Sequence, residues 1–177
     1  LLRPRHEQAA AYMAFGHARS TGEPGAYAVV PGPGVLNTLA ALSTAWATSS
    51  PVLCVTGQVP SHAIGSGAGY LHEIPDQLGI LSRLTRLADR INNPEDAESK
   101  IHQAMTAMLS GRPRPVSVEM PMDVMERITE VDDPGVFARP PRLAPDAGQV
   151  DDAAKLLCAA RSPLIYVGSG ALDASSE

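Results

Sequence analysis

The segment from Gly25 to Gln58 constrains the fold most strongly, because it predicts a strand, a rigid turn, a helix and a second strand in succession. The first strand, over residues 26–30, is short and apolar and runs into Pro-Gly-Pro-Gly at residues 31–34. Two prolines with fixed φ angles alternate there with two glycines that lack a Cβ, so the chain must turn sharply. A helix over residues 35–48 follows, and its predicted apolar face consists of Leu36, Leu39, Ala40, Leu42 and Trp46.

The second strand, over residues 52–56, is apolar on both faces. This composition favours the buried middle of a parallel sheet over an edge that faces water. We therefore expect an α/β fold with a mostly parallel sheet and helices on both faces. Ligands of such sheets bind outside the carboxyl ends of the strands, which makes the turn at 31–34 and the pair Gly57-Gln58 the candidate site.

The other elements of this first domain follow from periodicity and from stop signals. They are a helix over residues 6–20, a short helix over 76–81, a strand over 84–91, a helix from Asn93 to Leu109 and a strand over 116–120. The helix from Asn93 is expected to bury Ala97, Ile101, Ala104, Met105 and Met108. A long loop over residues 59–75 contains three glycines, and it either serves the site or is a surface excursion without a ligand.

The sequence predicts more than one domain. Residues 1–125 form the first α/β domain, and residues 126–149, which contain four prolines and no periodicity, predict a linker. Residues 150–177 predict a helix over 150–160 and a strand over 164–167, as at the start of a second, truncated α/β domain. Neither an initiator methionine nor a signal segment opens the chain, so we expect a fragment of a longer protein.

Composition excludes several classes of function. A net charge of −5 with a pI near 5.5 provides no basic face, so we expect no nucleic-acid partner. No apolar run approaches the roughly 20 residues of a membrane span, and we expect no membrane association. The two cysteines, Cys54 and Cys158, have no zinc or disulfide spacing, which favours the cytoplasm, and the five histidines form no metal-binding pattern.

Glu7 and the turn at 31–34 each have a local interpretation. A carboxylate in the first turn of a helix complements the helix dipole, which is sufficient to explain Glu7 from its neighbours alone. The turn lacks the successive N–H groups that a phosphate site needs, because Pro31 and Pro33 have no backbone donor. A rigid wall with few donors suits a flat ring better than a phosphate.

Four stretches resemble, in order and spacing, the pyrimidine-binding domain of thiamine-diphosphate enzymes of the acetolactate synthase group. They are Arg-His-Glu-Gln-Ala-Ala at residues 5–10, Gly-Pro-Gly-Val-Leu-Asn at 32–37, Pro-Val-Leu-Cys-Val-Thr-Gly-Gln-Val-Pro at 51–60 and Arg-Pro-Arg-Pro-Val-Ser-Val-Glu-Met-Pro-Met-Asp-Val at 112–124. The resemblance covers about residues 5 to 125, and it implies that the first strand and helix of that domain are missing before Leu1.

The resemblance implies a catalytic role for Glu7. In the family this glutamate hydrogen-bonds N1′ of the cofactor's aminopyrimidine and favours the tautomer whose N4′ takes the proton from thiazolium C2. We expect burial against an apolar ring to raise the pKa of Glu7. The positions that match the family's cofactor-binding residues are Gly32, Pro33, Gly34, Asn37 and Gln58. Gln58 either contacts the site directly or braces the loop that follows it.

Departures from the family concern the substrate. Pro31 replaces the usual serine, and the loop around residues 67–73 is longer than in acetolactate synthases. Leu71-His72-Glu73 aligns with a Phe-Gln-Glu stretch that approaches cofactor and substrate, so Leu71 and His72 are weaker candidates for contact with the substrate or with the residues around it. His72 is either an acid or base near neutral pH or a solvated loop residue. These changes argue against assuming acetolactate as the product.

The resemblance also implies cofactors and partners. The family binds the diphosphate through Mg²⁺ on a Gly-Asp-Gly motif that this sequence lacks, so another domain would hold the metal and no residue here is a metal ligand. We expect a 2-oxo acid substrate, a carboligase or decarboxylase activity, and a homodimer or homotetramer that shares the site between subunits; FAD is a further candidate cofactor. The alternatives are a non-catalytic relative with a binding or regulatory role, and a flavodoxin-like nucleotide or flavin binder.

Overall fold

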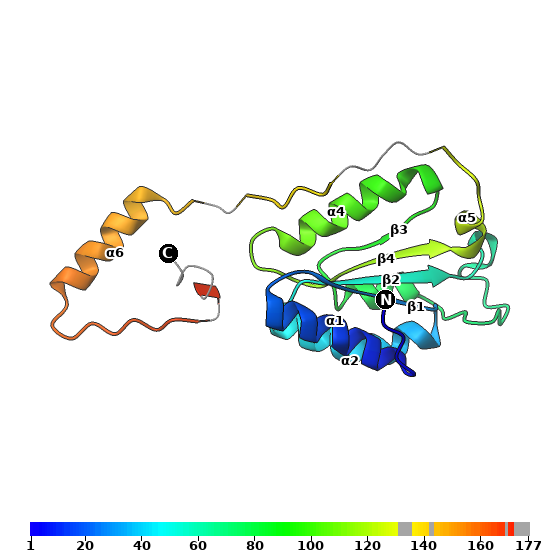
Figure 1. Cartoon of the computed structure of the whole chain (residues 1–177), viewed down its shortest axis with the longest axis horizontal. Coiled ribbons are helices and arrows are strands. Elements are labelled where there is room, and N and C mark those ends of the chain that lie inside the picture. Colours follow the sequence, from blue (N-terminus) through cyan, green and yellow to red (C-terminus); the bar gives the residue numbers. More distant parts are fainter. Residues whose placement is uncertain (131–135, 142–143, 169, 172–177) are drawn as a thin grey trace. The chain divides into compact units, whose positions relative to one another are not determined.

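The computed structural model describes residues 1–130, 136–141, 144–168 and 170–171 (Figure 1). They divide into two compact units, Leu1–Pro140 and Pro141–Glu177. The first unit contains every candidate site residue. Of the helices in the described ranges, none is long and apolar enough to cross a lipid bilayer.

The first unit is built on a four-stranded sheet in the order β1-β2-β4-β3. The strands are β1 (Gly25–Val29), β2 (Val52–Gln58), β3 (Ala88–Arg90) and β4 (Val116–Pro121). All neighbouring pairs are parallel, so the carboxyl ends of the strands lie at one edge of the sheet. The predicted α/β class with a parallel sheet is confirmed.

Helices cover both faces of this sheet (Figure 1). The helical elements of the first unit are α1 (Glu7–Thr21), α2 (Pro33–Ala47), η1 (Ser61–Ala63), α3 (Gln77–Ser82), η2 (Pro94–Asp96), α4 (Ala97–Leu109) and α5 (Met122–Met125). Helices α1, α2 and α3 share one buried core with β1 and β2, whereas α4 packs on the opposite face against β2 and β4. The expectation of helices on both faces is therefore confirmed.

Small residues let α1 pack directly on the start of β1. The helix begins after His6, whose Nδ1 accepts a hydrogen bond from the backbone N–H of Gln8, and it ends at Gly22 with φ 74°. Its buried face consists of Ala11, Ala14 and Ala18. A Cβ on Gly25 would lie 2.0 Å from the carbonyl oxygen of Ala14, so only glycine permits this approach.

The buried face of α2 differs from the predicted one. Its buried residues are Gly34, Val35, Thr38, Ala41, Leu42 and Ala45, so Leu42 was placed correctly. Leu39 is partly buried and packs against the same core, whereas Ala40 is exposed. Leu36 and Trp46 are 41% and 39% exposed. The helix begins at Pro33 and turns its small residues toward the shared core with α1, and Trp46 instead packs under the guanidinium of Arg114 at 4.5 Å.

Three further expectations for this unit were wrong in detail. The strand predicted over 84–91 is limited to Ala88–Arg90, because Leu84 still closes the last turn of α3, although Arg86 and Leu87 bond to the backbone of Pro115 and Ser117. The α-helix predicted from Asn93 begins only at Ala97, after a 3₁₀ turn over Pro94–Asp96, and the side chain of Asn93 donates to the carboxylate of Asp96 at 3.1 Å. Ile101 on α4 and Val55 on β2 were predicted to be buried, but they are 44% and 41% exposed.

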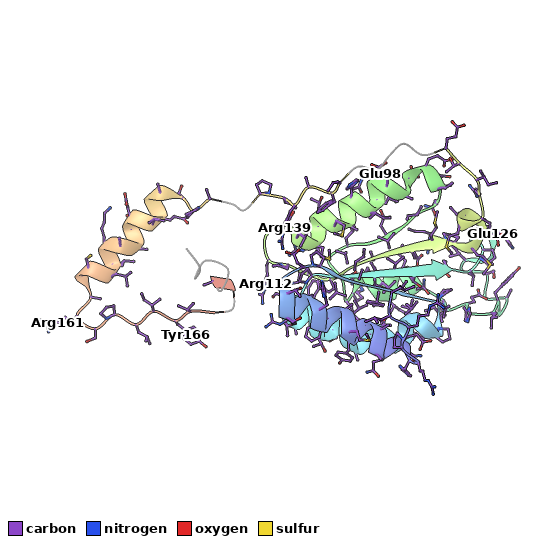
Figure 2. The ribbon with its side chains drawn as sticks, in the orientation of Figure 1. Glu98, Arg112, Glu126, Arg139, Arg161 and Tyr166 are labelled. Carbon is purple, nitrogen blue, oxygen red and sulfur yellow. The ribbon has the colours of Figure 1, made fainter. Side chains whose placement is uncertain are left out.

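In the described residues of the second unit, the one α-helix is α6 (Ala147–Ala159). It begins inside the predicted linker, because the side chain of Asp146 accepts the N–H of Gln149 at 2.9 Å and caps it. No residue of α6 is buried, and Arg161 and Tyr166 follow it in an extended segment (Figure 2). The strand predicted over 164–167 is not formed, since the described residues offer it no neighbouring strand to pair with.

Candidate functional site

The turn after β1 is fixed by close contact with the long loop. Gly32 adopts φ 62° and ψ −116°, a conformation that favours glycine. A Cβ at this position would lie 2.2 Å from the carbonyl oxygen of His72. The backbone of His72, itself at φ 70°, therefore packs on the turn, whereas the neighbouring Leu71 is 84% exposed.

Glu7 lies beside the same turn. The Nδ2 amide of Asn37, on α2, donates a hydrogen bond to Oε2 of Glu7 at 3.0 Å. A Cβ on Gly34 would lie 3.8 Å from Cγ of Glu7, so the glutamate side chain extends close to the start of α2. The structure thus brings Glu7 together with Gly34 and with Asn37, which follows it by 30 residues in the sequence.

The groups around Glu7 favour its charged form. Hydrogen bonding from its own backbone N–H and then from the Asn37 amide lowers the pKa of Glu7 below its ordinary value, while burial acts in the opposite direction. The expected rise of this pKa depends on burial against the cofactor ring, so it stays a prediction. The side chain is only half-buried and its partners are donors, so the charged form is the one that they stabilise.

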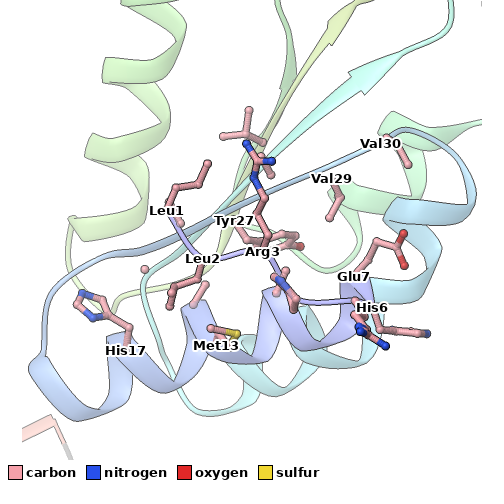
Figure 3. Close-up of a pocket in the computed structure, with 18 of the residues that line it drawn as sticks. Leu1, Leu2, Arg3, His6, Glu7, Met13, His17, Tyr27, Val29 and Val30 are labelled. Atoms are coloured by element: carbon pink, nitrogen blue, oxygen red, sulfur yellow. The ribbon is translucent and has the colours of Figure 1, made fainter.

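Glu7 also lines a cavity of about 930 Å³ along β1. Figure 3 shows Glu7 extending from the start of α1 toward Val29 and Val30, with His17 at the opposite end of the cavity. The valines give the wall near Glu7 an apolar character. Among the described residues, no group of three or more His, Cys, Asp or Glu side chains is placed to hold a metal ion.

The remaining candidates lie around this arrangement. Pro33 is exposed at the first position of α2, while Gly32 is buried. Gln58 is 3% exposed, and its Oε1 accepts the N–H of Val59 at 2.8 Å, as expected for a residue that braces the following loop. His72 is partly buried, and its backbone makes the contact with the turn.

Glu73 organises the loop that follows η1. Its carboxylate accepts the backbone N–H groups of Gly67 at 2.8 Å, Gly69 at 2.7 Å and Tyr70 at 2.9 Å. The N–H of Tyr70 makes the largest contribution to lowering the pKa of Glu73. This carboxylate is therefore engaged in the loop itself, and the loop conformation that places His72 against Gly32 depends on it.

The sequence analysis missed a buried polar network beneath the turn. Gln77 at the start of α3 is 1% exposed, and Glu119 in β4 is 0% exposed. Oε2 of Glu119 accepts a hydrogen bond from Nε2 of Gln77 at 2.7 Å, and its Oε1 is paired with Nε of Arg90 at 2.5 Å. A glutamate between Val118 and Met120 in a predicted strand was the available signal, because a buried charge requires partners.

Comparison with known proteins gives one family and a set of relatives. Residues 1–80 match the family described as "Thiamine pyrophosphate enzyme, N-terminal TPP binding domain". The chain is 39% identical over 171 residues to a protein of Pseudomonas aeruginosa named "Probable 2-ketoarginine decarboxylase", covering 96% of this chain and 31% of that protein. It is 36% identical over 174 residues to a "Probable acetolactate synthase large subunit" of Methanocaldococcus jannaschii, covering 95% of this chain and 29% of the relative.

An acetolactate synthase of Arthrospira platensis is similar to the same extent, with 37% identity over 180 residues that cover 98% of this chain and 30% of the relative. The chain therefore spans about three-tenths of the length of these curated relatives. The match runs through both structural units, whereas the family match lies within the first.

Proposed function

Because this chain carries the N-terminal, pyrimidine-binding domain of the thiamine pyrophosphate enzymes, we propose that it is part of an enzyme that uses thiamine diphosphate and Mg²⁺ to make or break a carbon–carbon bond next to a carbonyl. The observation that carries this proposal is the position of Glu7 at the turn after β1, hydrogen-bonded to Asn37. The names of the relatives, which include 2-ketoarginine, support a 2-oxo acid as the substrate.

The residues at the turn fit an aminopyrimidine ring. Such a ring is flat and weakly basic, so it needs apolar contact on its face and an acid at its ring nitrogen. Glu7 is the acid, and Val29 and Val30 provide apolar surface next to it (Figure 3). Pro31 and Pro33 have no backbone N–H, so they make the turn rigid and poor in donors, which suits a ring better than an anion.

In this proposal Glu7 shares a proton with the ring nitrogen, and Asn37 orients the carboxylate for that task. The amide of Asn37 engages Oε2, so we assign Oε1 to the ring. When bound, thiamine diphosphate supplies a stabilised carbanion at C2 of its thiazolium ring. Exclusion of water by the valines and by the ring would raise the pKa of Glu7 from its lowered value toward one at which a proton can be shared.

The residues that bind the rest of the cofactor lie, in this proposal, in other domains of the full-length protein. We assign the diphosphate and Mg²⁺ to a domain outside this chain, and we propose a homodimer or homotetramer in which the site lies between subunits. A carboligase and a decarboxylase both follow from the same Glu7 chemistry, and the names of the relatives include one of each kind.

The test uses the full-length protein with Glu7→Gln. We expect thiamine diphosphate to bind with nearly unchanged affinity by titration calorimetry, whereas the exchange of the C2 proton of bound cofactor, followed by NMR in D₂O, slows by roughly 10²-fold or more, as for loss of a general acid–base group. Glu98→Gln, at an exposed position on α4 (Figure 2), is the matched control. Unchanged exchange would remove Glu7 from the mechanism, and a wild-type protein that does not bind the cofactor would refute the function.

A further inference from the structure

We infer that Gln77 is a positioning residue that sets the conformation of the turn at 31–34, with the buried pair Glu119–Arg90 fixing the orientation of its amide. The inference rests on the proposed function only in assigning that turn to the cofactor. The hydrogen bonds themselves are properties of this chain.

Gln77 connects the carboxyl ends of three parallel strands. Its Oε1 accepts the backbone N–H of Gly32, directly after β1, at 2.7 Å. Its Nε2 donates to the carbonyl oxygen of Gly57 in β2 at 3.0 Å and to Oε2 of Glu119 in β4 at 2.7 Å. One side-chain amide thus fixes the turn after β1 relative to β2 and β4, the next two strands in the sheet.

The polarity of this network admits only one orientation of the amide. The carbonyl of Gly57 and the ion-paired carboxylate of Glu119 can only accept, whereas the N–H of Gly32 can only donate. The position therefore requires a side chain with one acceptor and two donors, which glutamine supplies. A glutamate at position 77 would place two carboxylates at the distance of a hydrogen bond, which is tolerated only when one of them is protonated.

The turn depends on this bond because it has few others. Pro31 and Pro33 have no N–H, so Gly32 provides the single backbone donor of residues 31–33. The φ and ψ angles of Gly32 are accessible to glycine among several others, so the backbone alone does not select them and the turn relies on contacts such as this hydrogen bond. Since the next residues of the turn lie beside Glu7, a displaced turn would also displace the surface proposed for the ring.

The first test measures amide hydrogen exchange of the segment 30–36 in the 177-residue chain without cofactor. In Gln77→Glu we expect this segment to exchange roughly tenfold faster than in the control Gln103→Glu at about pH 8, the size expected for loss of a buried hydrogen bond. The difference should shrink at about pH 5, because the carboxyl group introduced at position 77, once protonated, can again donate to Glu119. Gln103 is exposed on α4 and offers the same chemical change outside the network.

The double variant Gln77→Glu/Glu119→Gln exchanges the two functional groups. The carboxylate at 77 can accept from the N–H of Gly32 and from the new amide at 119, and the oxygen of that amide can accept from Arg90. Only the carbonyl of Gly57 loses its donor. Protection of the turn against hydrogen exchange should therefore return at about pH 8 to within about threefold of wild type. If Gln77→Glu does not fold, this double variant is compared with Glu119→Gln alone. If the double variant does not regain the protection of residues 30–36 against hydrogen exchange, the inference is overturned.

The second test measures the affinity of full-length protein for thiamine diphosphate. We expect Gln77→Glu to weaken binding by about tenfold at about pH 8 and less at about pH 6, and the double variant to restore it. If the wild type binds the cofactor and Gln77→Glu binds it with the same affinity, the inference is overturned. If amide hydrogen exchange is faster in Gln77→Glu but the wild type binds no cofactor, the network is supported and the proposed function is refuted.

Discussion

Gly32→Ala tests how tightly the turn after β1 is determined. The added Cβ would lie 2.2 Å from the carbonyl oxygen of His72, whereas real Cβ atoms essentially never approach another heavy atom within 3.0 Å. The obstacle is backbone on both sides, so a rotamer change cannot relieve it. Either the turn or the loop must move by roughly 1 Å, and movement of the turn would break the 2.7 Å hydrogen bond between Gly32 and Gln77.

Two contributions set the size of the effect. An alanine at the φ and ψ angles of Gly32 costs about 1–3 kcal/mol of backbone strain. Breaking the buried hydrogen bond to Gln77 leaves its partners unsatisfied, which costs about 1–3 kcal/mol more. We therefore expect Gly32→Ala to lower the free energy of unfolding by about 2–6 kcal/mol.

Gly22→Ala is the matched control, because Gly22 also has a positive φ of 74° but a Cβ there meets nothing within 4 Å. It should cost only about 1–2 kcal/mol. Both variants are compared by urea unfolding of the 177-residue chain, followed by circular dichroism. If Gly32→Ala loses no more stability than Gly22→Ala, the contact with His72 and the bond to Gln77 do not determine the turn.

Three further substitutions probe the rest of the domain by the same unfolding measurement. Leu81→Ala should lower the free energy of unfolding by about 3 kcal/mol, because this side chain is 0% exposed and leaves a cavity; a loss below about 1 kcal/mol would contradict its place in the core. Arg90→Met should cost about 3 kcal/mol by leaving Glu119 buried without its partner, at the low end of such losses since Arg90 is 23% exposed; a neutral result would mean that the pair is not formed. The N–H of Tyr70 and other loop donors lower the pKa of Glu73 below 4.5, so its contribution to stability is present above that pH and is lost as the pH falls through the lowered pKa. Glu73→Gln should therefore reduce the acid dependence of stability below pH 4.5, and an unchanged slope would exclude this carboxylate.

Local chemistry was sufficient to predict most of the fold. The alternation of proline and glycine at 31–34 required a turn, and the apolar segments at 26–30 and 52–56 required strands in a buried parallel sheet. Parallel pairing then placed the carboxyl ends at one edge, where the turn and Gln58 indeed lie. The position of Glu7 at the first turn of α1 also followed from sequence, but its place beside Asn37 was implied only by the resemblance.

What sequence could not predict depends on contacts between distant residues. The face of α2 is set by the small residues of α1, which let the two helices approach closely, and periodicity alone favoured the larger Leu36 and Trp46. The hydrogen bonds of Gln77 to Gly32 and Glu119 join residues 45 and 42 positions apart. No local pattern in a six-residue helix distinguishes such a glutamine from one that faces water.

The state of Glu7 in this chain bears on how the proposed chemistry would be switched on. A half-buried carboxylate with two donors has a lowered pKa and is ionised at neutral pH, so by itself it is a poor partner for sharing a proton. The same donors, however, fix the orientation of the group, and Val29 and Val30 beside it supply the apolar surface that a bound ring would complete. Orientation is thus built into the chain before binding, whereas the shift in pKa must come from the ring and the water that it displaces. In the proposed mechanism, this division lets a carboxylate that is ionised in the chain without cofactor become the group that shares a proton with the ring.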